Sequence, residues 1–306
     1  MPNQVDTGRS LGSKLKHRFM YALILLGGRR LAYVFLYAVA FFYSVSPSVS
    51  ARSAEYIKRR FSPKNKWQFF KHTYLLNLTF GRTLIDRAAL GILGHTQVSS
   101  TVAEQTLCRD LYQEGHGLLL LSAHAGCWQS AVYFFGHFLK GASVNILYYK
   151  NQKDNDKSVA EHQGRHAPFK QINPAGPLGG VAEMMIALQK GEVVCAMGDR
   201  VFGAQKNTVP VRFLGGTVYV PYSFYRLAGA TGAPIVAEFL PWERRGAFGT
   251  LTARVIRVPD LGPQKEKYIP YAQQFVDELE RFCIQYPYQF FNYYNLWESA
   301  CYAAND

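Results

Sequence analysis

A single histidine, His124, carries the sharpest signal for chemistry in this sequence. It stands within Leu121-Ser-Ala-His-Ala-Gly-Cys-Trp-Gln129, where an apolar run ends and a helical stretch begins. Its ordinary pKa lies near neutral pH, so an imidazole placed here is suited to act as a general base. Gly126 lets the backbone approach a ligand or turn tightly, and Gln129 is placed to accept the imidazole N–H. On these residues alone, a structural histidine with satisfied hydrogen bonds fits equally well.

Other catalytic and binding signatures in the sequence are weaker. It contains no G-x-S-x-G elbow, no G-x-x-x-x-G-K-[ST] loop and no G-x-G-x-x-G fingerprint. Ser122 lies only two residues from His124 and belongs to no known nucleophile motif, so we expect no serine nucleophile. His162 and His166 are spaced to share a helix face but lack a convincing third ligand, so we expect no metal site. The glycine-rich loop 176–180 fits a plain helix entry better than a phosphate site.

Short apolar runs that alternate with helical stretches must position His124. The run Leu118-Leu-Leu-Leu121 predicts a strand buried on both faces. Strands separated by helices predict an α/β core with a largely parallel sheet, and ligands gather at the strand ends of such sheets. The predicted strands cover residues 117–122, 144–149, 192–197, 209–213, 218–220, 234–240 and 251–258. The predicted helices cover residues 48–61, 64–93, 101–114, 128–139, 181–190, 222–230 and 265–286.

The positive charge of the chain is concentrated near its N-terminus. Residues 1–72 hold thirteen Lys or Arg and two acidic residues, whereas the other 234 residues hold 21 and 19. A nucleic-acid-binding domain would spread its bases over a folded face, so we expect no nucleic-acid partner. Cations beside a long apolar run are instead typical of a protein at an anionic membrane surface.

The apolar run itself has two parts. Residues 19–26 and 31–45 are apolar, and Gly27-Gly28-Arg29-Arg30 interrupts them. A full membrane span needs about 20 apolar residues, so the pattern favours a monotopic or shallow anchor over a clean span. A buried core helix and a signal peptide are less favoured alternatives. We therefore expect membrane-anchoring helices over residues 1–60 and a single α/β domain over 61–306, with a mixed, largely parallel sheet flanked by helices.

The cysteines bear on the cellular compartment. There are five, an odd number, scattered along the chain at positions 108, 127, 195, 283 and 301, and they form no C-x-x-C pair. This argues against a disulfide framework or a zinc site and for a reducing compartment.

Five stretches, in order, resemble the lysophospholipid acyltransferase superfamily, in particular the lauroyl/myristoyl acyltransferase branch of lipid A biosynthesis. The block from His124 to Gln129 resembles the H-x-x-x-x-[DE] signature of that superfamily. The other stretches are Arg29-Arg30-Leu-Ala-Tyr, Gly191–Arg200, Val211–Gly232 and the aromatic tail Tyr286–Trp297. The resemblance covers nearly the whole chain, although the tail has Tyr-Tyr-Asn where relatives tend to have His or Arg.

The resemblance implies an acyltransferase that transfers groups other than amino-acyl. In that superfamily the histidine removes a proton from an acceptor hydroxyl, which then attacks an acyl thioester. The implied partners are acyl carrier protein or coenzyme A as thioester donor, with no further cofactor, and a lipid, glycolipid or other amphiphilic acceptor. The implied location is the inner membrane, with the catalytic domain facing the cytoplasm. Asp199 and Arg200 are expected to bind the acceptor or its charge, and Arg165 stands where relatives place a basic active-site residue.

Position 129 departs from the family pattern, because it is Gln where relatives have Asp or Glu. A Gln can fix the tautomer of the imidazole but supplies no charge to the imidazolium. Three explanations follow: a working Gln-supported enzyme, a replacement acid from elsewhere with Asp199 as the obvious candidate, or lost catalysis. The third would make the chain a catalytically silent lipid-binding or scaffold homologue on the same fold.

Overall fold

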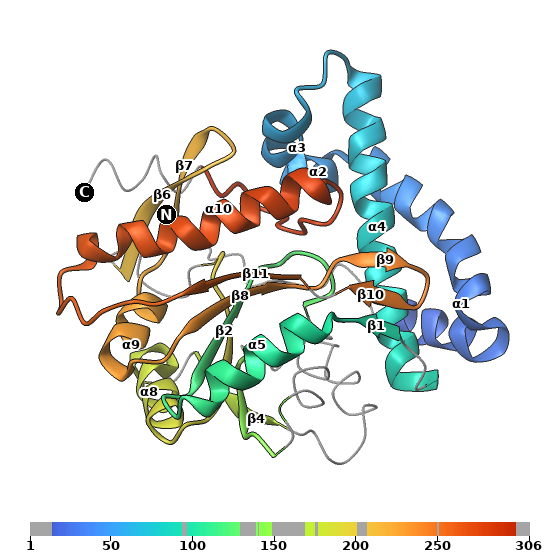
Figure 1. Cartoon of the computed structure of the whole chain (residues 1–306). Helices are drawn as coiled ribbons and strands as arrows, with labels where there is room; N and C mark the ends of the chain where they lie inside the picture. The colour runs from blue at the N-terminus through green and yellow to red at the C-terminus, as the bar shows by residue number, and fades with distance from the viewer. Residues whose placement is uncertain are drawn as a thin grey trace.

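A six-stranded sheet forms the centre of the molecule (Figure 1). The computed structural model describes residues 14–93, 97–128, 139, 141–148, 169–174, 177–200, 207–249 and 251–297. The strand order is β11-β8-β2-β5-β3-β4, and every neighbouring pair is parallel except β11 with β8. These strands are β2 (Leu118–Ser122), β3 (Val144–Leu147), β4 (Phe169–Ile172), β5 (Val193–Met197), β8 (Ile235–Phe239) and β11 (Leu251–Ile256). The α/β fold with a mixed, largely parallel sheet is thus confirmed.

Helices cover both faces of this sheet, as Figure 1 shows for α5 and α10. The described helices are α1 (Lys14–Val45), α2 (Pro47–Ser50), α3 (Ala54–Phe61), α4 (Lys66–Leu93), α5 (Val102–Gln113), α8 (Val181–Gln189), α9 (Ser223–Thr231) and α10 (Ile269–Gln285). Short 3₁₀ turns are η1 (Ala51–Ser53), η2 (Pro177–Gly180) and η4 (Lys265–Tyr268). The predicted helix over residues 128–139 lies almost entirely outside the described residues.

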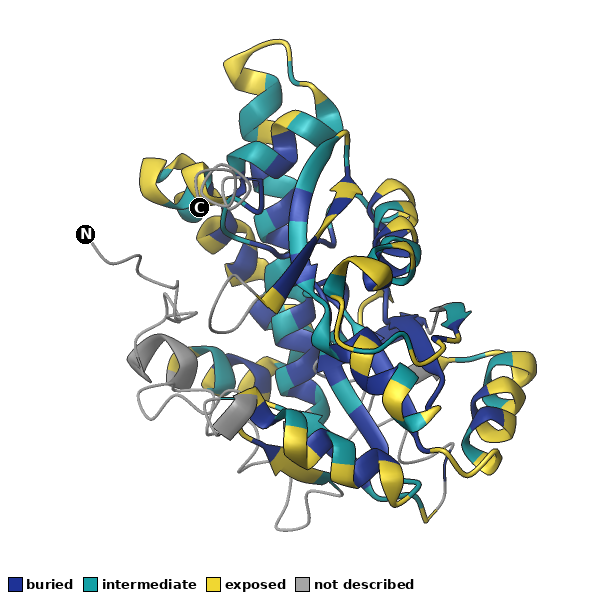
Figure 2. Cartoon of the chain, turned by 90° about the vertical axis from the view of Figure 1, so that its left-hand side faces the viewer, coloured by how far each residue is buried: buried dark blue, intermediate teal, exposed yellow. Residues whose placement is uncertain are grey.

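Strand β2 is buried on both faces, as its unbroken leucine run predicts. Leu119 and Leu121 face the cluster that contains α8, α9 and α10, whereas Leu118 and Leu120 face the cluster that contains Cys108 of α5. The alternation follows from the strand itself, because successive side chains point to opposite faces. Figure 2 shows the buried residues gathered between helices whose outer faces are exposed. The end of β2 is therefore held rigidly from both sides.

Two small sheets flank the central one. Strands β1 (Gln97–Ser99), β10 (Ala247–Gly249) and β9 (Trp242–Arg244) form one of them, and β6 (Thr208–Phe213) and β7 (Gly216–Pro221) form an antiparallel hairpin. The strands that the sequence pattern does not predict are β1, β4, β9 and β10. A three-residue strand is too short to show an alternation, and β4 is an edge strand in which Lys170 and Gln171 are exposed.

The helices near the N-terminus, α1 to α4, lie beside the sheet (Figure 1), and Tyr56, Ile57 and Leu76 join them to the main core. The stretch predicted as one helix over 48–61 is divided into α2, η1 and α3. Helix α1 is kinked at Gly28, whose φ of 62° and ψ of −166° are not helical. Among the described residues, Phe19–Val45 of α1 is long and apolar enough to cross a membrane, and only 22% of its most apolar window is buried. A core helix of a soluble protein would be mostly buried, so α1 does not have the burial of a core helix.

Candidate active site

His124 and Asp199 lie together because two neighbouring strands end in register. In the parallel pair of β2 and β5, Ser122 lies opposite Met197, and the N–H of Gly198 donates to the carbonyl of Ser122 at 2.8 Å. His124 and Asp199 are each two residues beyond this last pair. Carboxyl ends of adjacent parallel strands meet at one edge of a sheet, so the register itself brings the two side chains together.

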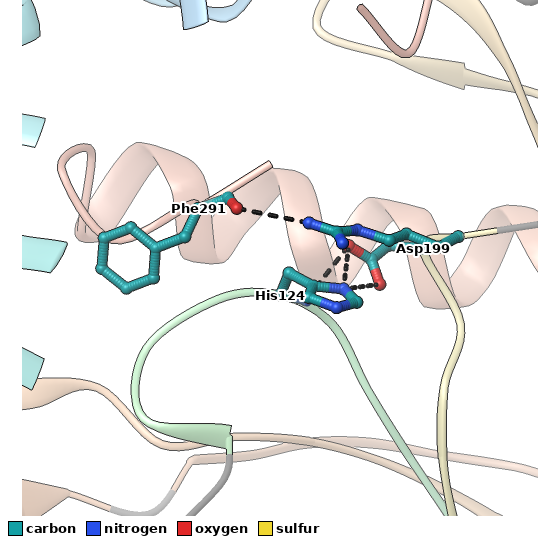
Figure 3. A network of polar contacts seen from close by, with 4 residues as sticks. His124, Asp199 and Phe291 are labelled. Atoms are coloured by element: carbon teal, nitrogen blue, oxygen red, sulfur yellow. Dashed lines mark hydrogen bonds and ion pairs between the residues drawn. The ribbon is translucent and has the colours of Figure 1, made fainter. Parts of the chain in front are cut away.

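The Asp199 carboxylate contacts His124 through both the ring and the backbone (Figure 3). The ring Nδ1 lies 3.0 Å from Oδ1 and 3.1 Å from Oδ2, and the backbone N–H of His124 donates to Oδ2 at 3.0 Å. An ionised carboxylate only accepts hydrogen bonds, so Nδ1 carries the proton and Nε2 has a free lone pair. No described residue forms a hydrogen bond with Nε2 of His124.

The electrostatic surroundings keep the ring neutral and the carboxyl ionised. Burial lowers the pKa of the His124 imidazole. The Asp199 carboxylate acts to raise this pKa and the Arg200 guanidinium acts to lower it further. The resulting pKa lies below its ordinary value. Burial acts to raise the pKa of the Asp199 carboxyl, but the His124 imidazole and the Arg200 guanidinium outweigh it and hold that pKa low. A neutral imidazole beside an ionised carboxylate is the resting state that a general base requires.

The loop that carries His124 is held by backbone hydrogen bonds to distant segments. The carbonyl of His124 accepts from the N–H of Phe291 at 2.7 Å, and the N–H of Gly126 donates to the carbonyl of Gln289 at 2.8 Å. Gly126 has a φ of +59°, and a Cβ there would overlap the carbonyl oxygen of Leu240. Glycine is therefore required, since other residues are strained at this φ and have no room.

Gln289 ties this loop to the β9–β10 hairpin. Its side-chain Oε1 accepts from the backbone N–H of Trp242 at 2.7 Å, and its Nε2 donates to the carbonyl of Trp242 at 2.7 Å. One buried amide thus satisfies both backbone groups of a strand residue, as a neighbouring strand would. The same residue binds Gly126 through its own carbonyl, so the aromatic tail positions the histidine loop.

Arg200 and Trp128 complete the surroundings of the pair. A guanidinium nitrogen of Arg200 lies 3.5 Å from the carbonyl of Phe291, and its Cζ lies 5.4 Å from the ring centroid of Tyr294. The Trp128 ring centroid lies 5.1 Å from that of His124 and 6.2 Å from that of Phe291. The imidazole therefore has a cation near its carboxylate partner and an aromatic ring beside it, a mixed polar and apolar setting suited to an amphiphilic substrate.

A match to a protein-family model identifies the family of the chain that carries this site. The model of the bacterial lipid A biosynthesis acyltransferases matches residues 78–299. The chain belongs to this family. The matched region includes every described residue of the site, and it begins within α4, after α1. A search among curated proteins found no match.

Membership of this acyltransferase family confirms the resemblance seen in the sequence. It makes acyl transfer to a lipid the activity of the family. Apolar α1 and the lipid acceptor together indicate association with a membrane.

In this member of the family, the structure brings together four of the six site residues chosen from the sequence. His124, Gly126, Asp199 and Arg200 lie at the ends of β2 and β5. Gln129 and Arg165 lie outside the described residues, as do His162 and His166. Within the described residues, no three His, Cys, Asp or Glu side chains group as metal ligands.

Four residues of the site were not predicted from the sequence: Gln289, Phe291, Trp242 and Trp128. The tail Tyr286–Trp297 stood out only as a family block, and its contacts with the histidine loop are long-range. The unusual density of aromatic residues in the tail was the one local signal that could have drawn attention to it.

Proposed function

We propose that this chain transfers an acyl group from a thioester of acyl carrier protein or coenzyme A to a hydroxyl or amine of a lipid or glycolipid, with His124 as general base. The observation that carries the proposal is the arrangement of His124, whose Nδ1 is bound by Asp199 and whose Nε2 is left with a free lone pair. The family supports the reaction class, and the geometry of His124 supports its role as the base.

The reaction needs one proton transfer when the acceptor attacks the thioester and a second when the thiol leaves. Nε2 of His124 takes the proton of the acceptor hydroxyl while the hydroxyl oxygen attacks the carbonyl carbon of the thioester. The tetrahedral intermediate then collapses, the carbon–sulfur bond breaks, and the imidazolium returns its proton to the thiolate. The products are the acylated acceptor and the free thiol, and no enzyme-bound acyl group forms.

Asp199 supplies the charge that Gln129 does not. The carboxylate is buried and lies 3.0 Å from Nδ1, so it stabilises the imidazolium that forms during proton transfer. This geometry supports the explanation in which a replacement acid comes from elsewhere in the chain. The role of Asp199 in this proposal is thus to orient the base, rather than to bind the acceptor.

Arg200 is suited to act on charge that develops during the reaction. It lies beside the buried pair and its Nε has no hydrogen-bond partner within the described part of the chain. A guanidinium with an unused donor can bind an anionic head group or stabilise the oxyanion of the tetrahedral intermediate.

We place the chain at the inner membrane, with its catalytic domain facing the cytoplasm. Support comes from the match to a bacterial lipid A family and from the five cysteines of the sequence. They are odd in number, are scattered along the chain and form no C-x-x-C pair, which suits a reducing compartment.

Lipid mass spectrometry with two matched variants tests the proposal. Cells that carry His124→Ala should lack an acylated lipid that the wild-type chain produces, and cells that carry His116→Ala should retain it. His116 is an exposed histidine at the opposite end of β2, so it controls for the substitution itself. Undiminished acylation by a folded His124→Ala protein would overturn the proposal.

A catalytically silent, lipid-binding homologue is the second candidate, and Gln129 is the observation that favours it. It predicts that wild-type cells and cells lacking the chain have the same acylated lipids. It also predicts no turnover by purified wild-type chain or by a Gln129→Glu variant.

A further inference from the structure

Helix α1 exposes many large apolar side chains on both sides of its kink. Ala32, Leu36, Ala40 and Ser44 recur every four residues and are buried against α4. The opposite face of the helix exposes large apolar side chains, and Leu26 and Phe42 are 84% and 69% exposed. The others are Phe19, Leu25, Val34, Phe35, Tyr37, Val39, Phe41 and Val45. An apolar surface of this extent on a folded protein marks an interaction site.

The arm of α1 that follows the kink, residues 29–45, is fixed to α4, and the two helices lie side by side in Figure 1. At the first end of this arm, Arg29 and Tyr33 of α1 bind the carboxylate of Asp86 in α4, at 3.2 Å and 2.7 Å. At the other end, Asn77 of α4 donates to Ser44 at 2.9 Å. Polar contacts at both ends, with an apolar stripe between them, hold α1 on α4.

Asp86 also fixes this helix pair to the catalytic body. Its Oδ2 accepts from Trp242 Nε1 at 2.7 Å and from the N–H of Gly246 at 3.0 Å, and both residues belong to the β9–β10 hairpin. Trp242 is in turn bound by Gln289, which binds the histidine loop. One buried carboxylate therefore joins α1, α4 and the segment next to the candidate active site.

These contacts are incompatible with a helix that crosses a bilayer. If residues 29–45 lay within the hydrocarbon core, α4 and the β9–β10 hairpin would have to enter it together with their polar groups. The uncharged arm Leu31–Val45 is only about 22 Å long, against a core of about 30 Å. The kink at Gly28 prevents the two apolar parts of α1 from forming one straight rod.

The first turns of α4 extend the apolar face and add positive charge. Trp67 is 72% exposed and stacks on Phe70 at 5.7 Å, and Phe70 contacts Phe41 of α1 at 5.8 Å. Lys64, Lys66 and Lys71 are exposed in the same region. Residues 14–93 contain only two acidic residues, Glu55 and Asp86, and both are engaged by arginines. Amphipathic rings and lysines together are suited to an anionic lipid headgroup layer.

We propose that α1 and the start of α4 form one docking surface that lies on a single anionic leaflet, with α1 in the plane of the membrane. Asp86 keeps this surface in a fixed position relative to His124. The inference rests on the membrane association in the proposed function and adds its geometry: the whole chain stays on one side of the bilayer.

Protease protection with two tags tests the geometry. The full chain, with one epitope tag at each end, is expressed in bacteria and probed in spheroplasts and in inverted membrane vesicles. We expect both tags to be cut in inverted vesicles and both to be protected in spheroplasts. Protection of the N-terminal tag alone in inverted vesicles would show a spanning α1 and overturn the inference, while leaving membrane association intact. A chain that is soluble and dimeric through α1 would overturn both.

Vesicle binding tests the surface itself. Lys66→Gln with Lys71→Gln should weaken binding to phosphatidylglycerol-containing vesicles about 30-fold, since each lysine near an anionic surface contributes about fivefold. The matched pair Lys190→Gln with Lys267→Gln removes two exposed lysines of α8's end and η4 and should leave binding unchanged. Brominated lipids should quench the fluorescence of wild-type chain, and Trp67→Phe should remove most of that quenching. Equal vesicle binding by the two double-lysine variants, or quenching that persists in Trp67→Phe, would contradict the proposed docking surface.

Discussion

The carboxylate of Asp199 holds His124 at two points, with Oδ1 3.0 Å from the ring Nδ1 and Oδ2 accepting the backbone N–H at 3.0 Å. One side chain thereby fixes the tautomer, the ring orientation and the path of the loop. The residues are 75 positions apart in the chain, and only the pairing of β2 with β5 makes them neighbours.

Asp199→Asn should lower kcat by about 10³- to 10⁴-fold with little change in KM. An amide can donate to Nδ1 and hold the wrong tautomer, which costs about 10⁴ in a serine protease. Steady-state kinetics of the purified variant measures this. Asp110→Asn, an exposed carboxylate of α5, is the control and should retain full activity. A loss under tenfold in the Asp199 variant would remove this residue from the mechanism.

Gln129→Glu should change turnover by less than about threefold. If Asp199 already supplies the charge for the imidazolium, a second acid adds little and brings like-charge repulsion. The measurement is kcat of the variant beside wild type. A gain of about 30-fold or more would show instead that the wild-type base lacks an acid.

The acid limb of kcat/KM should lie below pH 6.5. Burial lowers the pKa of His124 below its ordinary 6.5, so the imidazole stays neutral and competent through neutral pH. Arg200 also lowers this pKa, so Arg200→Gln should move the acid limb to higher pH, whatever its effect on maximal rate. An acid limb that stays in place or moves to lower pH would contradict the claim that Arg200 lowers the pKa of His124.

The lowered pKa of His124 should also make the folded chain less stable at acidic pH. Between the lowered pKa of folded His124 and the ordinary value of 6.5 in the unfolded chain, the unfolded state binds more protons. The free energy of unfolding contributed by this residue therefore falls as pH drops below about 6.5. Denaturant titrations at several pH values, repeated with His124→Gln, should show this loss in wild type and a smaller one in the variant.

Gly126→Ala should destabilise the fold by about 2–4 kcal/mol and abolish turnover. The new Cβ has to overlap the carbonyl of Leu240, and a left-handed φ adds about 1 kcal/mol. Gly215→Ala provides the comparison, because Gly215 has a φ of +74° and nothing within 4 Å of its Cβ position. That variant should lose only about 1 kcal/mol. Equal losses at the two glycines would contradict the close approach at Gly126.

Asp86→Asn should cost about 3–5 kcal/mol, because it removes the buried carboxylate that pairs with the partly buried guanidinium of Arg29 and accepts hydrogen bonds from Tyr33 and Trp242. Tyr33→Phe removes only one of the hydrogen bonds to Asp86 and should cost about 1 kcal/mol. Denaturant unfolding in detergent gives both values. A loss under about 1 kcal/mol for Asp86→Asn would show that this carboxylate does not hold α1 to the body.

Local patterns in the sequence were sufficient to predict several features of the structure. The leucine run of β2, the position of His124 just beyond it and the interrupted apolar segment 19–45 are all visible along the chain, because each depends on neighbouring residues alone. The same holds for Gly126, since a glycine beside a strand end predicts a close approach of backbone. The roles proposed for Gln129 and Arg165 remain predictions.

Tertiary structure decided which distant residues meet these features. Asp199 lies against His124 because β5 pairs with β2 in register, and a one-residue shift would turn the carboxylate to the other face of the sheet. Asp86 meets Arg29 and Trp242 only because α4 lies between α1 and the β9–β10 hairpin. Charge and hydrogen-bond partners of this kind are chosen by strand order and helix packing, which no local periodicity encodes. Local sequence is enough to propose His124 as the base and α1 as the anchor, whereas strand pairing and helix packing bring a carboxylate to each of them.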